Sequence, residues 1–346
     1  MVTQSIPVTH DEITHWRLAI VRGRDWLAKQ LDLAPPFGQQ NPDLNWYAKL
    51  PWPLMITGRR QSALRALDAV ERRLHSGTLH NVCQNEWTNA VPYALGWLVT
   101  GAVLCERYDS AYRLYTALNR FVCPTTGGLY SVFPQSRPDH SFFDLGIQGA
   151  LLHAAVAIGD LTTACRTAAL MEQWFEEQPD REAGLFMRFH PQLGYLQDVS
   201  YTPQIQWMFV PGGVRQPWAN LGFVLQGLLR VSAATGDLRY LATARRILEH
   251  ILEEYRDDVL GHSQNHKVAH AAVVLYRATG KALFLEAAVT IARRMADNIQ
   301  ADGRALADIF FDDIALQPDY ASVRTTCDSI LWLQCLCDEL EFVVQP

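Results

Sequence analysis

Apolar positions along the chain define two kinds of predicted helix that alternate. The first kind is apolar almost all round and rich in Gly and Ala, as in WANLGFVLQGLLRVSAA from Trp218. The second kind carries one polar face, as in TGDLRYLATARRILEHIL from Thr235, with Arg245, Arg246 and Glu249 on that face. A helix that is apolar on every side is buried, whereas a helix with one polar face lies on the outside. The pattern therefore predicts helical hairpins, each with an inner and an outer helix.

Six inner helices are predicted, and an outer helix follows each of the first five. Short turns join them, with glycines such as Gly236 and Gly280 placed where a left-handed residue ends a helix. The helix predicted over 11–31 is available to complete the sixth hairpin. We expect a single domain over 1–346, an all-α (α/α)6 toroid of helical hairpins. The inner helices are predicted at 46–57, 87–104, 142–158, 218–235, 266–279 and 322–340.

The connections between hairpins are long, and all of them emerge on one face of the predicted ring. Long loops on a rigid scaffold commonly carry binding and catalytic residues. The longest, 177–217, alternates apolar residues with turn glycines such as Gly212 and Gly213. It predicts a small β-hairpin insertion on this long-loop face. The long connections are 75–86, 122–141, 177–217, 256–265 and 299–321.

Three segments resemble the α/α-toroid superfamily, which includes six-hairpin glycosidases, sugar epimerases, terpenoid cyclases and linalool dehydratase-isomerase-like enzymes. TGDLRYLATARRILEHIL and NHKVAHAAVVLYRATGKALFLEAA resemble its hairpin repeats, and GGLY at 127–130 resembles a loop before an inner helix. The resemblance covers nearly the whole chain and concerns architecture. The DxDD run of protonating terpenoid cyclases is missing, because Asp312 and Asp313 form only a pair. A shared fold does not assign the chemistry.

Composition and charge narrow the possible partners. The formal net charge is −6 and no basic run occurs, which argues against nucleic acid as a partner. The longest apolar run, 91–104, is too short to span a membrane. The first dozen residues are polar and acidic, so we expect no secretory leader and a cytoplasmic protein. Seven cysteines without a CxxC pair suit reduced thiols.

Titratable residues near the starts of the inner helices are candidates for general acid/base catalysis, because these starts face the central cavity. Asp144 lies in an otherwise apolar helix, where an ionised carboxylate must be paired or functional. His140 would share its helical face, with Asp139 as the expected N-cap. Glu86 also has a structural alternative, because a carboxylate at a helix N-terminus interacts favourably with the helix dipole. The catalytic candidates are His80, Glu86, His140, Asp144, His266 and Asp312.

A second set of residues is predicted to bind substrate. Lys49, flanked by aromatic residues, could bind an anionic or carbonyl group, and burial would lower its pKa. Arg324 could anchor a carboxylate or phosphate, or form a structural ion pair. The aromatic members suit stacking on a sugar or an apolar ligand, and core packing is their alternative role. The set comprises Tyr47, Lys49, Trp87, Tyr130, Arg188, Trp207, Trp218, Tyr320 and Arg324.

No cofactor or metal is expected. His262, His266 and His270 recur every four residues, but no acidic residue is interleaved as in a HExxH zinc site. A nucleotide, flavin or serine-hydrolase signature is also lacking.

The leading functional hypothesis is a cofactor-independent acid/base enzyme of isomerase, cyclase or lyase type, acting on a small organic metabolite in the central cavity. The alternatives are a carbohydrate-active enzyme, either a glycoside hydrolase or a sugar epimerase, and a non-catalytic binding toroid. A narrow apolar cavity with one acid and one histidine would favour the first, and an open polar groove with tryptophans the second. A filled centre without perturbed pKa values would favour the third. A homo-oligomer is compatible with each.

Overall fold

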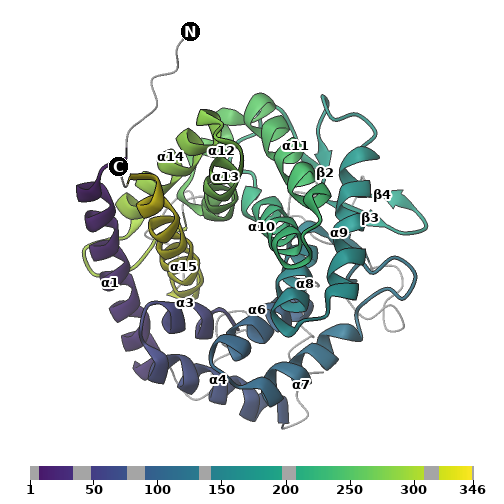
Figure 1. The fold of residues 1–346 in the computed structure, drawn as a ribbon. Coiled ribbons are helices and arrows are strands. Elements are labelled where there is room, and N and C mark those ends of the chain that lie inside the picture. The colour runs from purple at the N-terminus through teal and green to yellow at the C-terminus, as the bar shows by residue number, and fades with distance from the viewer. Residues whose placement is uncertain are drawn as a thin grey trace.

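The computed structural model describes residues 8–33, 48–75, 90–131, 142–196, 208–307 and 319–344. In this part of the chain the helices form two concentric rings (Figure 1). The inner ring consists of α3 (Pro51–Ile56), α6 (Ala90–Leu104), α8 (Leu145–Ile158), α10 (Trp218–Thr235), α13 (His266–Thr279) and α15 (Asp319–Val344). The outer ring consists of α1 (His10–Leu33), α4 (Arg60–His75), α7 (Tyr108–Asn119), α9 (Leu161–Glu176), α11 (Leu238–Glu254) and α14 (Ala282–Asn298). The predicted (α/α)6 toroid is confirmed.

The inner helices form a closed ring. Each packs against the next in chain order, and α15 packs against α3, so the sixth inner helix meets the first. The helix α1 packs along α15 and takes the outer position beside it (Figure 1). The first helix of the chain thus lies next to the last.

Glycine and aspartate together make the short turns between the inner and outer helices. Gly159 ends α8 with φ of 85°, and Gly236 ends α10 with φ of 76°. Glycine adopts this left-handed conformation without steric cost, whereas a Cβ would strain it. The next residue starts the outer helix: the carboxylate of Asp160 accepts a hydrogen bond from the Thr163 amide, and that of Asp237 from the Arg239 amide.

Glycines inside the inner helices allow the helix backbones to approach closely. A Cβ built on Gly149 of α8 would lie 2.8 Å from the backbone of Phe223 in α10. One built on Gly222 would lie 2.5 Å from the backbone nitrogen of Val268 in α13. These contacts explain why the apolar inner helices are rich in small residues.

The N-terminus of α8 differs from the predicted helix over 142–158. Phe143 and Asp144 form strand β1, and the helix begins at Leu145. Asp144 is the N-cap, because its carboxylate accepts a hydrogen bond from the Gly146 amide at 3.0 Å. The expected N-cap, Asp139, lies outside the described residues. Because the helix starts only after Asp144, the early start that a shared helical face of His140 and Asp144 requires is not found, and His140 itself lies outside the described residues.

The long insertion contributes short antiparallel strands. β3 (Arg188–His190) and β4 (Gly194–Tyr195) form a hairpin, and β3 also pairs with β1. β2 (Leu185–Phe186) pairs with β5 (Met208–Phe209). The segment predicted as loop over 256–265 contains the short helix α12 (Arg256–Gly261) and a 3₁₀ turn. The predicted β-hairpin in the insertion is therefore present.

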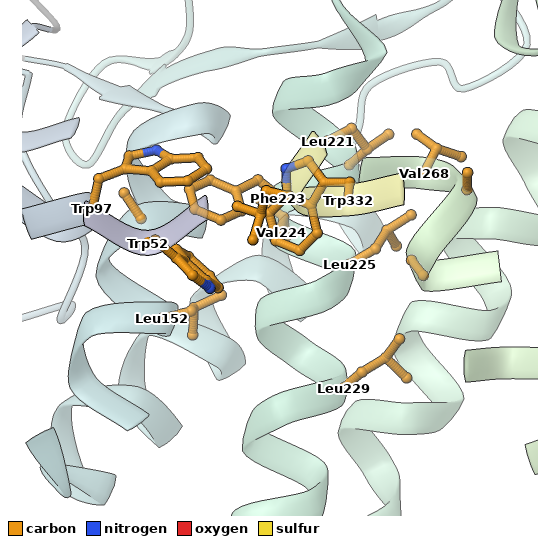
Figure 2. Packing of buried hydrophobic residues seen from close by; sticks show 14 of the residues in the cluster. Trp52, Trp97, Leu152, Leu221, Phe223, Val224, Leu225, Leu229, Val268 and Trp332 are labelled. Carbon is orange, nitrogen blue, oxygen red and sulfur yellow. The ribbon is translucent and has the colours of Figure 1, made fainter. Parts of the chain in front are cut away.

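Each of the six inner helices contributes one aromatic side chain to the centre of the toroid. We call these six side chains the aromatic layer. Their centroids lie close together, for example 5.4 Å between Trp52 and Trp332 and 4.3 Å between His153 and Phe223. Figure 2 shows Trp52, Trp97, Phe223 and Trp332 converging from different helices. The layer consists of Trp52 of α3, Trp97 of α6, His153 of α8, Phe223 of α10, His270 of α13 and Trp332 of α15.

No helix among the described residues is both long enough and apolar enough to cross a membrane. The six described cysteines form no disulfide, and each is buried or half-buried.

Candidate functional site

Four buried polar side chains lie together above the aromatic layer, and we call them the central cluster: Lys49, His266, Lys267 and Asp328. Lys49 Nζ forms an ion pair with Asp328 Oδ2. Lys267 Nζ lies 3.5 Å from Asp328 Oδ1 and 3.1 Å from His266 Nε2. His266 Nε2 lies 3.7 Å from the same Asp328 oxygen. One carboxylate therefore holds two lysines and faces an imidazole.

Helical periodicity places the central cluster one turn away from the aromatic layer. Asp328 precedes Trp332 by four residues on α15, and His266 precedes His270 by four on α13. Residues four apart in a helix lie on the same face, one turn along the axis. In each case the polar residue is nearer the N-terminus of its inner helix, at the end where the long connections enter. The cluster thus lies on the long-loop side, with the aromatic layer as its floor.

The aromatic layer contacts both lysines through the faces of its rings. Lys49 Nζ lies 4.8 Å from the ring centroid of Trp97, and Lys267 Nζ lies 5.3 Å from that of Phe223. Tyr93, one turn before Trp97 on α6, has its ring centroid 5.3 Å from Lys49 Nζ. An ammonium over an aromatic ring is stabilised by the ring quadrupole, more so where water is excluded.

Burial and mutual charge perturb the pKa of every member. Burial lowers the pKa of Lys49 and Lys267, although the Asp328 charge opposes this effect. Burial and the Lys267 charge lower the pKa of His266 to about 4. Burial raises the pKa of Asp328, but the charges of Lys267 and Lys49 outweigh it and hold this pKa well below its usual range. At neutral pH the cluster therefore contains an ionised carboxylate and a neutral imidazole.

The central cluster leaves hydrogen-bonding capacity unused. The Nδ1 atom of His266 is buried and has no hydrogen-bond partner among the described residues, and the side chain is almost fully enclosed. The Nε1 atom of Trp97 instead faces the Tyr93 hydroxyl, which accepts from it. Buried polar atoms normally have a protein or water partner, so the unpaired Nδ1 atom of His266 is unusual.

One edge of the cluster is less enclosed. Tyr93 is half-buried and Arg324 is exposed, and the Arg324 charge acts on Lys49, Lys267 and Tyr93. Arg324 lies on α15, one turn before Asp328 and further toward the long-loop face. Arg324 therefore lies at the exposed edge of the central cluster, and its predicted binding role stays a prediction.

The contacts described for the other candidates are with residues outside the central cluster. Asp144 Oδ2 accepts a hydrogen bond from Arg188 Nε at 3.0 Å, and Arg188 is fully buried, with its guanidinium centre 4.8 Å from the Phe142 ring centroid. This pair joins β3 to the start of α8. Tyr130 packs on Phe143, with ring centroids 4.9 Å apart.

Trp218 packs inside the protein. Its ring is fully buried and stacks on Phe209 of β5 at 3.9 Å between centroids, and its Nε1 donates to Asp258 Oδ2 at 2.6 Å. Asp258 also faces His262 at 3.4 Å, so that histidine is part of the same packing. These contacts hold the insertion and α12 against α10.

Several candidates lie outside the described residues, and their predicted roles stay predictions. For Tyr320 only the backbone, within α15, is described. The residues outside are Tyr47, His80, Glu86, Trp87, His140, Trp207 and Asp312. Among the residues that are described, no group of three or more His, Cys, Asp or Glu side chains could hold a metal ion.

Sequence reasoning overlooked Asp328, the residue that joins the cluster. Its signal was similar to the one used for Asp144: a carboxylate within the apolar stretch of an inner helix, where an unpaired charge is costly. Lys267, an equally isolated lysine in an inner helix, carries the same signal. The pairing of both with Lys49 depends on ring closure between α15 and α3, which no local spacing reveals.

No protein-family model matches the chain, and no curated protein matches it in sequence. Solved structures do resemble it. The unsaturated glucuronyl hydrolase from Bacillus sp. GL1 has a TM-score of 0.63 at 14% identity, covering 95% of this chain and 98% of that one. Cellobiose 2-epimerase from Bacillus thermoamylovorans B4167 has a TM-score of 0.63 at 10% identity, covering 93% and 99%.

A third similar structure is an inactive variant of the α-1,6-mannanase GH76A from Salegentibacter sp. HEL1_6, in complex with α-1,6-mannotetrose. Its TM-score is 0.62 at 13% identity, covering 94% of this chain and 99% of that one. At such low identity the likeness concerns the fold, and these three proteins all belong to the α/α-toroid superfamily. The resemblance predicted from the hairpin repeats is confirmed at this level: the chain has the fold of the α/α-toroid superfamily.

Proposed function

We propose that the protein is a carbohydrate-active enzyme that binds a sugar over the central cluster, and that its reaction is a proton transfer of the epimerase or isomerase type. The observation that carries the proposal is the buried group of Lys49, His266, Lys267 and Asp328 at the centre of the ring. The similar toroids support a sugar over other metabolites, because a mannanase, a glucuronyl hydrolase and a cellobiose epimerase share the fold.

The chemistry of the described residues favours proton abstraction over glycoside hydrolysis. A glycoside hydrolase needs a carboxylic acid with a raised pKa as its proton donor. Asp328 is the carboxyl group of the cluster, and its lysine partners hold its pKa well below the usual range. His266 is neutral, with its pKa lowered to about 4, and it has an unpaired ring nitrogen. A neutral imidazole can remove a proton from the carbon beside a sugar carbonyl.

Each remaining member has a role in this scheme. Removal of the carbon-bound proton places negative charge on the carbonyl oxygen, and the buried amines of Lys49 and Lys267 can stabilise it. Asp328 holds both lysines in position through its two oxygens. His266 can return the proton on the same face to the neighbouring carbon while the hydroxyl proton passes to the former carbonyl oxygen, which isomerises the sugar; inversion of the first carbon would need a second acid on the opposite face. Trp97 and Phe223 support the two lysines from beneath through their ring faces.

Solvent exchange tests the proposal across many sugars at once. The full-length protein is incubated in D₂O with a panel of reducing mono- and disaccharides, and deuterium at the carbon beside the carbonyl is followed by NMR. We expect exchange with at least one sugar, lost in the His266→Gln variant. Release of new reducing ends from oligosaccharides, without exchange, would instead identify a hydrolase. The absence of both reactions across the panel would overturn the proposal.

A further inference from the structure

A second polar group lies on the opposite side of the aromatic layer, toward the short turns. Arg230 follows Phe223 by seven residues on α10, which places it about 10 Å further along the helix. Its guanidinium centre lies 5.3 Å from the ring centroid of Trp52, beneath the layer. Arg230 is half-buried, so the space beside it is reachable from outside. We use the name short-turn recess for Arg230 and Cys335 together with His153 and His270, the two histidines of the aromatic layer.

Arg230 lacks a counter-ion. In the part of the chain that the structure describes, it makes no hydrogen bond and no ion pair, and its recorded contact is the Trp52 ring. Other arginines of the protein are paired, such as Arg188 with Asp144 and Arg277 of α13 with Glu339. Burial lowers the pKa of Arg230, but a guanidinium stays charged in proteins. A half-buried guanidinium without a protein partner keeps its five N–H donors for water or a ligand.

His153 supplies independent evidence for a missing ligand. The side chain is fully buried, and the backbone of Phe223 can serve as hydrogen-bond partner for at most one of its ring nitrogens. The other nitrogen, like the buried Nδ1 atom of His270, has no hydrogen-bond partner among the described residues. Both histidine rings pack on Trp332, and the Trp52 ring contacts both His153 and Arg230. Buried ring nitrogens without a partner are rare in a protein core.

We propose that the short-turn recess binds a small oxyanion, a phosphate or carboxylate group, with Arg230 as its cationic anchor and His153 and His270 as hydrogen-bonding partners. A planar guanidinium matches such oxyanions with two parallel hydrogen bonds. Each histidine can donate one N–H while neutral. Trp52 forms the wall between this recess and the central cluster, because its ring contacts Trp97 at 5.1 Å on the cluster side. The proposal does not depend on the sugar chemistry above.

Titration of the full-length protein tests the recess directly. Inorganic phosphate and acetate are added separately at constant ionic strength, and binding is followed by calorimetry and by tryptophan fluorescence, because Trp52 contacts Arg230. We expect saturable binding of at least one of the two, with one site per chain. Phosphate alone would identify a phosphate site, and acetate alone a carboxylate site. Binding of neither would overturn the proposal.

Two variants locate the site. Arg230→Gln should weaken binding at least tenfold. Arg277→Gln is the matched control, because Arg277 follows His270 by seven residues on α13, as Arg230 follows Phe223 on α10. It should leave binding unchanged, since Arg277 is already paired with Glu339. Equal binding by wild type and Arg230→Gln would refute the assignment. If Arg230→Gln does not fold, Arg230→Lys serves, because it keeps the charge and loses the planar fork; unweakened binding there would count equally against the proposal.

Discussion

Two buried carboxylates in this protein differ in the charges around them. Asp144 pairs with Arg188, and its other oxygen caps the first turn of α8. Asp328 meets two lysines and an imidazole, and the Nδ1 atom of that imidazole has no partner among the described residues. Burial alone therefore does not separate a charge that stabilises the fold from one that takes part in the proposed reaction. We expect the cations around each carboxylate to separate them, so variants in the two regions should behave differently.

The largest expected effect is on catalysis. His266→Gln removes the proposed base, so turnover of the sugar identified by solvent exchange should fall about 10²- to 10⁴-fold. The matched variant His262→Gln changes a histidine that faces Asp258 outside the cluster and should retain nearly full turnover. Steady-state kinetics of both variants provide the measurement. Equal loss in the two would argue against a specific role for His266.

The next effect is on stability. Arg188→Met leaves Asp144 as an enclosed carboxylate without this cation, and the free energy of unfolding should fall by about 3–5 kcal/mol. Urea denaturation followed by circular dichroism measures this. Arg65→Met, which breaks an exposed pair with Asp32, is the control and should cost less than about 1 kcal/mol. A cost for Arg188→Met as small as that of the control would show that the Asp144 pair is not structural.

Acid should destabilise the protein through its buried neutral histidines. The pKa of His266 is lowered from 6.5 to about 4, so the unfolded chain binds this proton first as the pH falls. Its contribution to stability is present above pH 6.5 and is lost as the pH falls toward 4, about 2 kcal/mol by pH 5. Unfolding of wild type and His266→Gln at pH 7 and pH 5 should differ by that amount. Identical acid sensitivity would mean that His266 is not buried in its neutral form.

The smallest stability effect is expected at the central cluster. Lys267→Met leaves Lys49 to balance Asp328 and removes one buried ammonium, so the free energy of unfolding should change by less than about 1 kcal/mol or rise. Sugar turnover should fall at the same time. A loss of several kcal/mol, as expected for Arg188→Met, would place Lys267 among the structural charges.

The sequence predicted the scaffold well and the site less completely, for a physical reason. Helix periodicity and the Gly-Asp turns are local, and they determined the inner and outer helices; α10 and α13 have the predicted bounds. The central cluster depends instead on which inner helices become neighbours across the closed ring. Lys49 and Asp328 are 279 positions apart, and their ion pair exists only because α15 packs against α3. Lys49 and His266 were recognised, but the carboxylate that joins them was not.

The most direct test of the account compares sugar binding by two isosteric variants. Asp328→Asn and Asp144→Asn each replace a buried carboxylate by an amide, and circular dichroism confirms that each is folded. Calorimetric titration with the sugar found by solvent exchange then measures the affinity of both. We expect Asp328→Asn to lose binding at least tenfold, whereas Asp144→Asn should bind like the wild type. Retained binding in Asp328→Asn, or loss confined to Asp144→Asn, would contradict it.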